Sequence, residues 1–137
     1  MWRFLSDHQS VEGILRDKDL AKLGDGLVNL CYSLAKSQII GKPTGEKVRD
    51  KVLARAIRAT PVYDKLNRRT DTGRAADAYE ATIAYLWLKG KVTIEDLVES
   101  LTNDMTSEIS ASRKRENEIS SQAFQNLLEK ITHLLPQ

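Results

Sequence analysis

Apolar residues recur at helical spacing along most of the chain, and no segment shows the alternation that predicts a β-strand. Within residues 18–37, leucines stand three or four positions apart, at Leu20, Leu23, Leu27, Leu30 and Leu34. A second apolar stripe runs from Phe124 to Leu135. The pattern predicts an all-α protein of about six or seven helices.

Polar and small residues between these stripes predict where helices begin and end. Ser6 and Gln9 have the spacing of a capping box that opens a short first helix. Thr44 is expected to cap a helix over residues 46–59. Further expected boundaries are a helix start at Thr60–Pro61, a helix end at Gly90 and a capping box formed by Thr93 and Asp96.

Length and composition predict one soluble domain over residues 1–137. Apolar residues make up 41% of the chain and charged residues 29%, as in ordinary globular proteins. No segment has the apolar length of a membrane span, and the first residues do not resemble a secretory signal. The single cysteine, Cys31, fits a reducing, cytoplasmic location. His8 and His133 lie too far apart in sequence to suggest a zinc site.

The net charge of +2 hides a strongly basic stretch. Between Lys42 and Arg74 the chain has ten basic and four acidic residues, a local net charge of +6. Such an excess can neutralise phosphates, although a solvated basic helix face would give the same pattern.

Two carboxylates interrupt the apolar segment GRAADAYEATIAYLWLKG, residues 73–90. Asp77 and Glu80 are three residues apart and share one helix face, while the surrounding alanines allow another helix to approach closely. Burying two unpaired carboxylates is costly, so a cation is expected beside them. The candidates are a neighbouring Arg or Lys side chain and a Mg²⁺ ion.

A third carboxylate stands between two glycines in LAKLGDGLVNL, residues 20–30. Each glycine lowers helix stability by about 1 kcal/mol relative to alanine, so a close approach of another backbone or of a ligand is expected. The structural alternative is a tight helix crossing at Gly24 and Gly26 that leaves Asp25 merely exposed.

These segments together resemble the ribonuclease III family. LAKLGDGLVNL is similar to the family's LEFLGDSVLNL type of motif, and AADAYEATIAYLWLKG is similar to its ADVFEALIGAIYLDGG type of motif. RDKVLARAI, residues 49–57, is weakly similar to the family's SNKTLARIA region. The resemblance covers about residues 15–105 and leaves a C-terminal helical extension at about residues 106–135. That extension predicts helices without strands, so no double-stranded RNA-binding domain is expected there.

The resemblance implies the family's helical endonuclease fold, acting as a homodimer on double-stranded RNA. By motif, Asp25, Asp77 and Glu80 are the catalytic residues and the ligands of Mg²⁺, with Mn²⁺ as a possible substitute. In the family, the bound ion activates water for hydrolysis of a phosphodiester bond, which leaves 5′-phosphate and 3′-hydroxyl ends. The expected role is therefore RNA processing by a magnesium-dependent hydrolase.

The chain departs from the family pattern beside Asp25. Ala21 replaces the family's glutamate one turn earlier, Lys18 replaces an acid a further turn back, and Lys22 replaces an aromatic residue of the family's dimer contact. The short mini-ribonuclease III branch is similar in having alanine at the first of these positions. Trp2, Phe4 or the C-terminal helix are alternative contributors to a dimer.

Three functions remain open at this stage. The first is an endoribonuclease that holds RNA through its basic residues. The second is an inactive family fold that binds structured RNA or scaffolds a complex, which Ala21 and Lys18 favour. The third is a helical interaction protein whose acids pair with Arg58 or Arg74. The RNA-binding candidates are Asn29, Lys51, Arg55, Arg68, Arg69 and Arg74.

Overall fold

The computed structural model describes residues 2–66 and 69–136, and every regular element in them is helical, which confirms the predicted all-α fold. The α-helices are α1 (Val11–Leu15), α2 (Lys18–Ile40), α3 (Asp50–Arg58), α4 (Thr72–Leu88), α5 (Ile94–Asn103) and α6 (Arg113–Ile131). Short 3-10 helices follow α3, α5 and α6, at η1 (Pro61–Leu66), η2 (Ser107–Ser110) and η3 (Thr132–Leu134). None of the helices in this part of the chain is long and apolar enough to cross a membrane.

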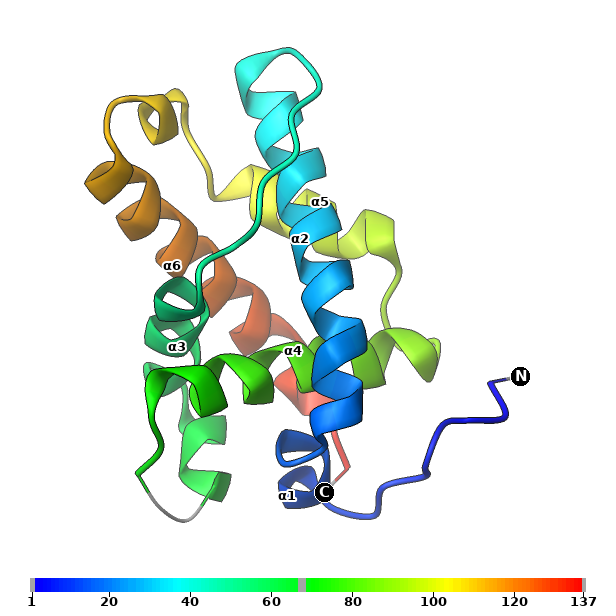
Figure 1. Ribbon diagram of the computed structural model, residues 1–137. Coiled ribbons are helices and arrows are strands. Elements are labelled where there is room, and N and C mark those ends of the chain that lie inside the picture. Colours follow the sequence, from blue (N-terminus) through cyan, green and yellow to red (C-terminus); the bar gives the residue numbers. More distant parts are fainter. Residues whose placement is uncertain (1, 67–68, 137) are drawn as a thin grey trace.

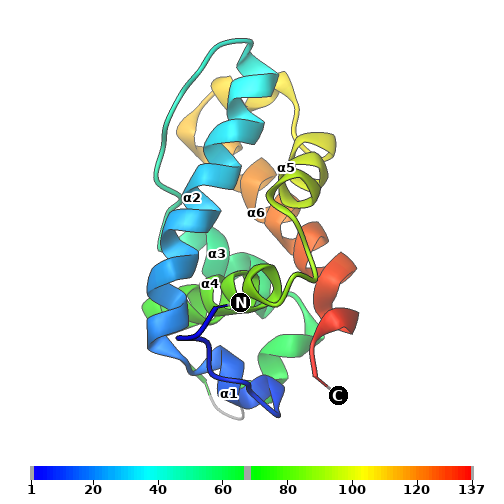
Figure 2. The ribbon, with the colours of Figure 1, turned by 90° about the vertical axis from the view of Figure 1, so that its right-hand side faces the viewer.

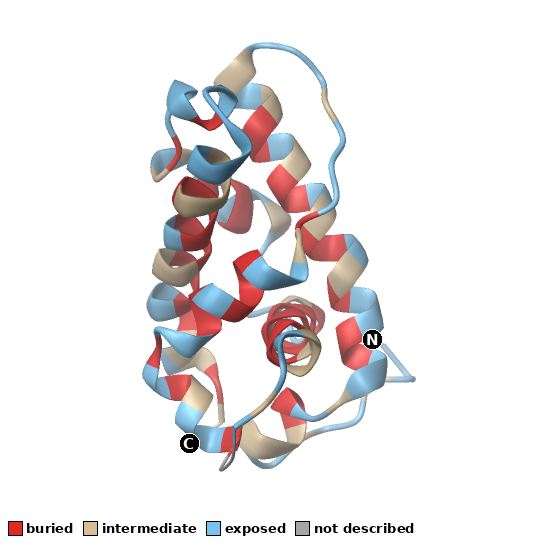
Figure 3. Cartoon of the chain, turned by 60° about the vertical axis from the view of Figure 1, so that its left-hand side comes forward, coloured by how far each residue is buried: buried red, intermediate tan, exposed pale blue. Residues whose placement is uncertain are grey.

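Helix α4 lies at the centre of the bundle. Helix α2 crosses it, and α1 and α3 pack against it, while α6 closes the bundle against α3 and α5 (Figures 1 and 2). In Figure 3, α4 is seen nearly end-on, with buried residues on almost all of its faces. A helix that is apolar on all sides is stable only when other elements cover it. The alanine-rich, mostly apolar sequence of α4 is therefore stable only at a central position, where neighbouring helices cover it.

The crossing of α2 over α4 depends on Gly24. A Cβ atom at this position would lie 1.9 Å from the carbonyl oxygen of Glu80, so no larger residue fits without moving a backbone. Gly26 is exposed, and nothing would meet a Cβ atom there. The expected close approach is thus confirmed at Gly24 and is wrong at Gly26.

The first helix begins later than predicted. Ser10 caps α1 by accepting a hydrogen bond from the backbone N–H of Gly13 at 3.2 Å. Ser6 and Gln9 precede the helix and do not form its capping box, so that prediction was wrong. The capping box of Thr93 and Asp96 at the start of α5 is confirmed.

Helix α3 also begins later than predicted, at Asp50 rather than at residue 46. Thr44 does not cap it, because its backbone N–H donates to Ser37 Oγ on α2 at 2.9 Å. Ser33 Oγ similarly accepts from the backbone N–H of Glu46 at 2.9 Å. These bonds hold the segment before α3 along the side of α2, where it cannot take up helical bonding of its own.

The C-terminal apolar stripe belongs to the core. Phe124 is buried and meets Tyr79 edge-on, with 5.6 Å between the ring centroids. The Tyr79 hydroxyl donates to the carbonyl oxygen of Phe124 at 2.6 Å. Leu127 and Leu128 are buried on the same side of α6. The stripe therefore packs inside this chain and is not free to form a dimer surface.

Candidate functional site

The crossing at Gly24 brings the carboxylates of α2 and α4 together. Asp25 follows Gly24 on α2, and Glu80 is the residue of α4 whose backbone Gly24 touches. Glu80 is only 4% exposed. Burial, a hydrogen bond with Asp25 and the negative charges of Asp25, Asp50 and Asp77 raise the pKa of Glu80 to about 9. The predicted meeting of these two acids across a helix crossing is therefore present.

Asp77 stands one turn before Glu80 on α4 and is half-buried. Burial raises its pKa, and the negative charge of Asp50 acts in the same direction. Lys18 and Arg74 oppose this shift, and both line a small cavity together with Asp77. The positive side chains thus approach Asp77 from the side of the crossing that faces the start of α2.

Asp50 is a fourth carboxylate of this site, which the sequence analysis missed. It is the first residue of α3, and its charge raises the pKa of both Asp77 and Glu80. In the sequence it stands between Arg49 and Lys51 and reads as an ordinary acid in a first helical turn. The available signal was its place in RDKVLARAI, the segment that resembles the middle family motif. These four residues (Asp25, Asp50, Asp77 and Glu80) are called the carboxylate site below.

Within residues 2–66 and 69–136, no ion pair involves any member of the carboxylate site. Arg58 donates to the carbonyl oxygen of Thr70 at 2.8 Å instead of to a carboxylate. Over the same residues, no three His, Cys, Asp or Glu side chains are arranged so that they could hold a metal ion together. The site therefore combines one buried carboxyl group, Glu80, with three more accessible acids, and no ion pair among the described residues engages any of them.

The whole length of the domain, from α2 to the C-terminal end, matches a known family. A family model described as Ribonuclease III matches residues 18–136. The chain belongs to the ribonuclease III family. The match includes α6, the helix that closes the core. No curated protein sequence matches the chain.

The ribonuclease III motif around Asp25 includes Asn29, whose amide is engaged on both sides. Its Nδ2 donates to Asp25 Oδ1 at 3.4 Å, and its Oδ1 accepts from the backbone N–H of Val48 at 2.7 Å. Asn29 thereby links Asp25 to the segment that leads into Asp50. The geometry supports a positioning role for Asn29; direct contact with RNA remains a prediction.

The positions at which this chain departs from the ribonuclease III pattern lie on α2. Ala21 is buried one turn before Asp25 and, as an alanine, supplies no carboxylate to the site. Lys18 is exposed, and its positive charge acts to lower the pKa of Asp77. Lys22 is also exposed and lies 3.8 Å from Asp19. A cation beside the site, expected from Lys18, is thus present.

The predicted RNA-binding residues lie in two places. Lys51 and Arg55 are exposed on α3, where they line an open groove with α6. Arg69 is exposed before α4, and Arg74 is half-buried beside Asp77. Arg68 lies outside the described residues. Of the predicted basic residues that the structure describes, Arg74 lies beside a predicted catalytic acid, Asp77, while Asn29 bonds to another, Asp25.

Proposed function

We propose that this chain is a Mg²⁺-dependent endoribonuclease that hydrolyses double-stranded or structured RNA as a homodimer. Membership of the ribonuclease III family supports endoribonuclease activity at the level of the family. The observation that carries the proposal is the meeting of Asp25 and buried Glu80 at the Gly24 crossing, where neither acid forms an ion pair with a described residue.

The carboxylate site fits Mg²⁺ by its chemistry. Mg²⁺ prefers oxygen ligands, keeps several waters, and is usually bound by one or two carboxylates together with substrate phosphate. Asp25 and Glu80 would hold the ion, and Asp50 and Asp77 would add negative charge beside it. No three acids among the described residues are placed to hold a metal ion together.

Each residue of the site has a distinct task in the proposed reaction. A bound Mg²⁺ ion would supply activated water and offset charge on the phosphate. Asn29 orients the Asp25 carboxylate through its Nδ2. Arg74 and Lys18, on the Asp77 side, are placed to attract the phosphate of the substrate and to hold it beside the acids. Nearby Lys51 and Arg55 are proposed to contact other phosphates of the same RNA.

An exposed apolar stripe on α2 supports the homodimer. Leu23, Leu30 and Leu34 are 50%, 47% and 40% exposed. Their spacing of seven and four residues puts them on one face of the helix, to the side of the buried face that contains Gly24 and Val28. A second copy of the chain is the proposed occupant, because a two-fold axis would bring two such stripes together. Trp2 and Phe4 are exposed as well.

The alternative function is RNA binding without cleavage. It is favoured by Ala21, which removes one family acid, and by Lys18, which lies where a positive charge competes with a cation. This function predicts that duplex RNA binds equally well with and without Mg²⁺ and is never cut.

The experiment that separates the two is cleavage of an end-labelled RNA duplex with Mg²⁺ and with Mn²⁺. The chain is compared with Glu80→Gln, Asp25→Asn and the control Asp64→Asn, an exposed acid of η1. We expect cutting by the wild type and the control, and its loss in both site variants. A wild type that binds the duplex but cuts it with neither metal would contradict catalysis and support the alternative.

A further inference from the structure

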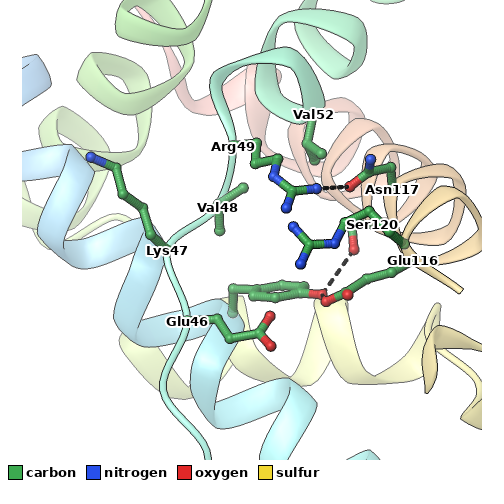
Figure 4. A pocket seen from close by; sticks show the side chains of 10 residues that line it. Glu46, Lys47, Val48, Arg49, Val52, Glu116, Asn117 and Ser120 are labelled. Atoms are coloured by element: carbon green, nitrogen blue, oxygen red, sulfur yellow. Dashed lines mark hydrogen bonds between the residues drawn. The ribbon is translucent and has the colours of Figure 1, made fainter.

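A second concave site lies between the segment before α3 and the N-terminal half of α6. Its volume is about 250 Å³. Glu46, Val48 and Arg49 line it from one side, and Asn117 and Ser120 of α6 line it from the other (Figure 4). It lies on the opposite side of the first turn of α3 from the carboxylate site. None of the functions assigned above uses it.

Two arginines enter this pocket without an acidic partner. Arg49 points toward α6, where its Nη1 approaches Asn117 Oδ1 at 3.5 Å (Figure 4). Arg113, the first residue of α6, lines the same pocket and is exposed. Across the described ranges, neither guanidinium forms an ion pair. Two guanidiniums that share one pocket repel each other unless an anion joins them.

The two acids of the pocket share one lysine. Lys36, whose side chain is 11% exposed, donates to Glu46 at 2.6 Å and to Glu116 at 2.9 Å. The Tyr32 hydroxyl also donates to Glu116, and Ser120 Oγ donates to Tyr32 at 3.1 Å. The floor is thus a hydrogen-bond network in which one lysine faces two carboxylates, a net charge of −1, while the two arginines of the rim carry +2.

We propose that Arg49, Arg113 and Asn117, called the arginine pocket, bind a phosphate group of the RNA backbone. Guanidinium groups match phosphate oxygens in a two-point fork, and the Asn117 amide can add a donor. The identity of the ligand as RNA rests on the proposed function, but the proposal does not require that the RNA is cut.

The surroundings of the arginine pocket favour a phosphate of an RNA strand as its ligand over a free phosphate ion. An adjoining open groove of about 590 Å³ shares Arg113 and Asn117 with the pocket and continues past Lys51, Arg55 and Lys114. Arg49 also directly precedes Asp50 of the carboxylate site. A phosphate held at Arg49 therefore fixes the position of a strand relative to the acids, which is the usual task of phosphate contacts.

The first test uses inorganic phosphate and NMR of the arginine side chains. Phosphate is titrated at constant ionic strength, with chloride as the control anion. The Nε–H signals, assigned with Arg49→Gln and Arg113→Gln, are followed. We expect saturable shifts of the Arg49 and Arg113 signals and none of Arg3, which lies in the N-terminal segment. Shifts that are absent, or equal for all three arginines, would overturn the site.

The second test measures binding of an RNA duplex without divalent metal, so that cleavage does not enter. We expect Arg113→Gln to weaken binding roughly tenfold and to lower the slope of log affinity against log salt by about 1. Arg113→Lys should keep the slope but lose part of the affinity, because it keeps the charge and not the fork. Lys91→Gln, which removes an exposed charge before α5, is the matched control.

Two outcomes would reject a backbone phosphate as the ligand. If phosphate shifts the arginine signals but Arg113→Gln and Lys91→Gln bind RNA alike, the pocket is a site for a free anion. If a duplex with a 5′-phosphate binds more tightly than one without it, and only through Arg113, the ligand is a terminal phosphate. If the wild type binds the duplex but does not cut it, the nuclease proposal is contradicted, while the proposal for the arginine pocket is unaffected.

Discussion

The carboxylate site and the arginine pocket lie on two sides of the first turn of α3, yet they are built in different ways. Glu80 is buried at a helix crossing and has other carboxylates as its neighbours. Around the arginine pocket, Lys36 joins Glu46 and Glu116 through hydrogen bonds, and the two rim arginines outweigh the one negative charge that remains. A hydrogen-bonded network of opposite charges supports a rigid floor, whereas neighbouring carboxylates without an ion pair favour a bound cation.

The largest expected effect is at the crossing that builds the carboxylate site. Gly24→Ala would place a methyl group 1.9 Å from the Glu80 carbonyl oxygen. We expect it to lower the free energy of unfolding by at least about 3 kcal/mol, measured by urea denaturation. Gly26→Ala is the control, because open space surrounds that position, and it should raise stability by up to about 1 kcal/mol. Equal effects of the two substitutions would refute the close crossing.

The second-largest loss of stability is expected in the floor of the arginine pocket, when Lys36 is replaced. Lys36→Met leaves Glu46 and Glu116 without their shared cation, and we expect a loss of about 2 kcal/mol in the same denaturation experiment. Adding Glu116→Gln should restore part of that loss, because it removes one of the two unpaired charges. A double variant no more stable than Lys36→Met alone would show that the pairing with Glu116 contributes little.

The pH dependence of the free energy of unfolding tests the burial of Glu80 in the carboxylate site. Since the pKa of Glu80 rises to about 9, the folded state keeps a proton that the unfolded state releases above its ordinary pKa near 4.5. Without divalent metal, unfolding free energy should therefore fall as pH rises from about 5 to about 9, by at least about 1 kcal/mol. Glu80→Gln should flatten this curve. A wild type whose stability is flat over that range would contradict burial of an acid at the crossing.

The smallest expected effect concerns Asp50. Mg²⁺ should raise the thermal midpoint of the wild type, because an ion that binds only the folded state stabilises it. The rise should vanish in Asp25→Asn and shrink, without vanishing, in Asp50→Asn, since Asp50 adds negative charge beside the ion and does not hold it. Asp64→Asn should behave like the wild type. If Mg²⁺ raises the thermal midpoint of Asp50→Asn as much as that of the wild type, Asp50 does not belong to the metal site.

Helix periodicity predicted α2, α4, α5 and α6 well, because each buries one stripe or its whole circumference. Motif resemblance singled out Asp25, Asp77 and Glu80. The predicted caps at Ser6 and Thr44 were wrong, because Ser10 caps α1 and Arg49 is the residue that precedes α3. A side chain with capping chemistry acts as a cap only if the following backbone is free to become helical, and the backbone near Thr44 is bonded to Ser33 and Ser37 of α2.

The sequence by itself determined the helical class and the glycine that permits a crossing, because both follow from spacing between residues three or four apart. It also singled out Asp25, Asp77 and Glu80, through their resemblance to the family motifs. The tertiary structure decided that Asp50 joins those acids, that Asn29 ties Asp25 to the start of α3, and that Arg49 and Arg113 share a pocket. Such meetings join residues far apart in the chain. Their distances depend on how helices cross, and a one-dimensional pattern does not contain that information.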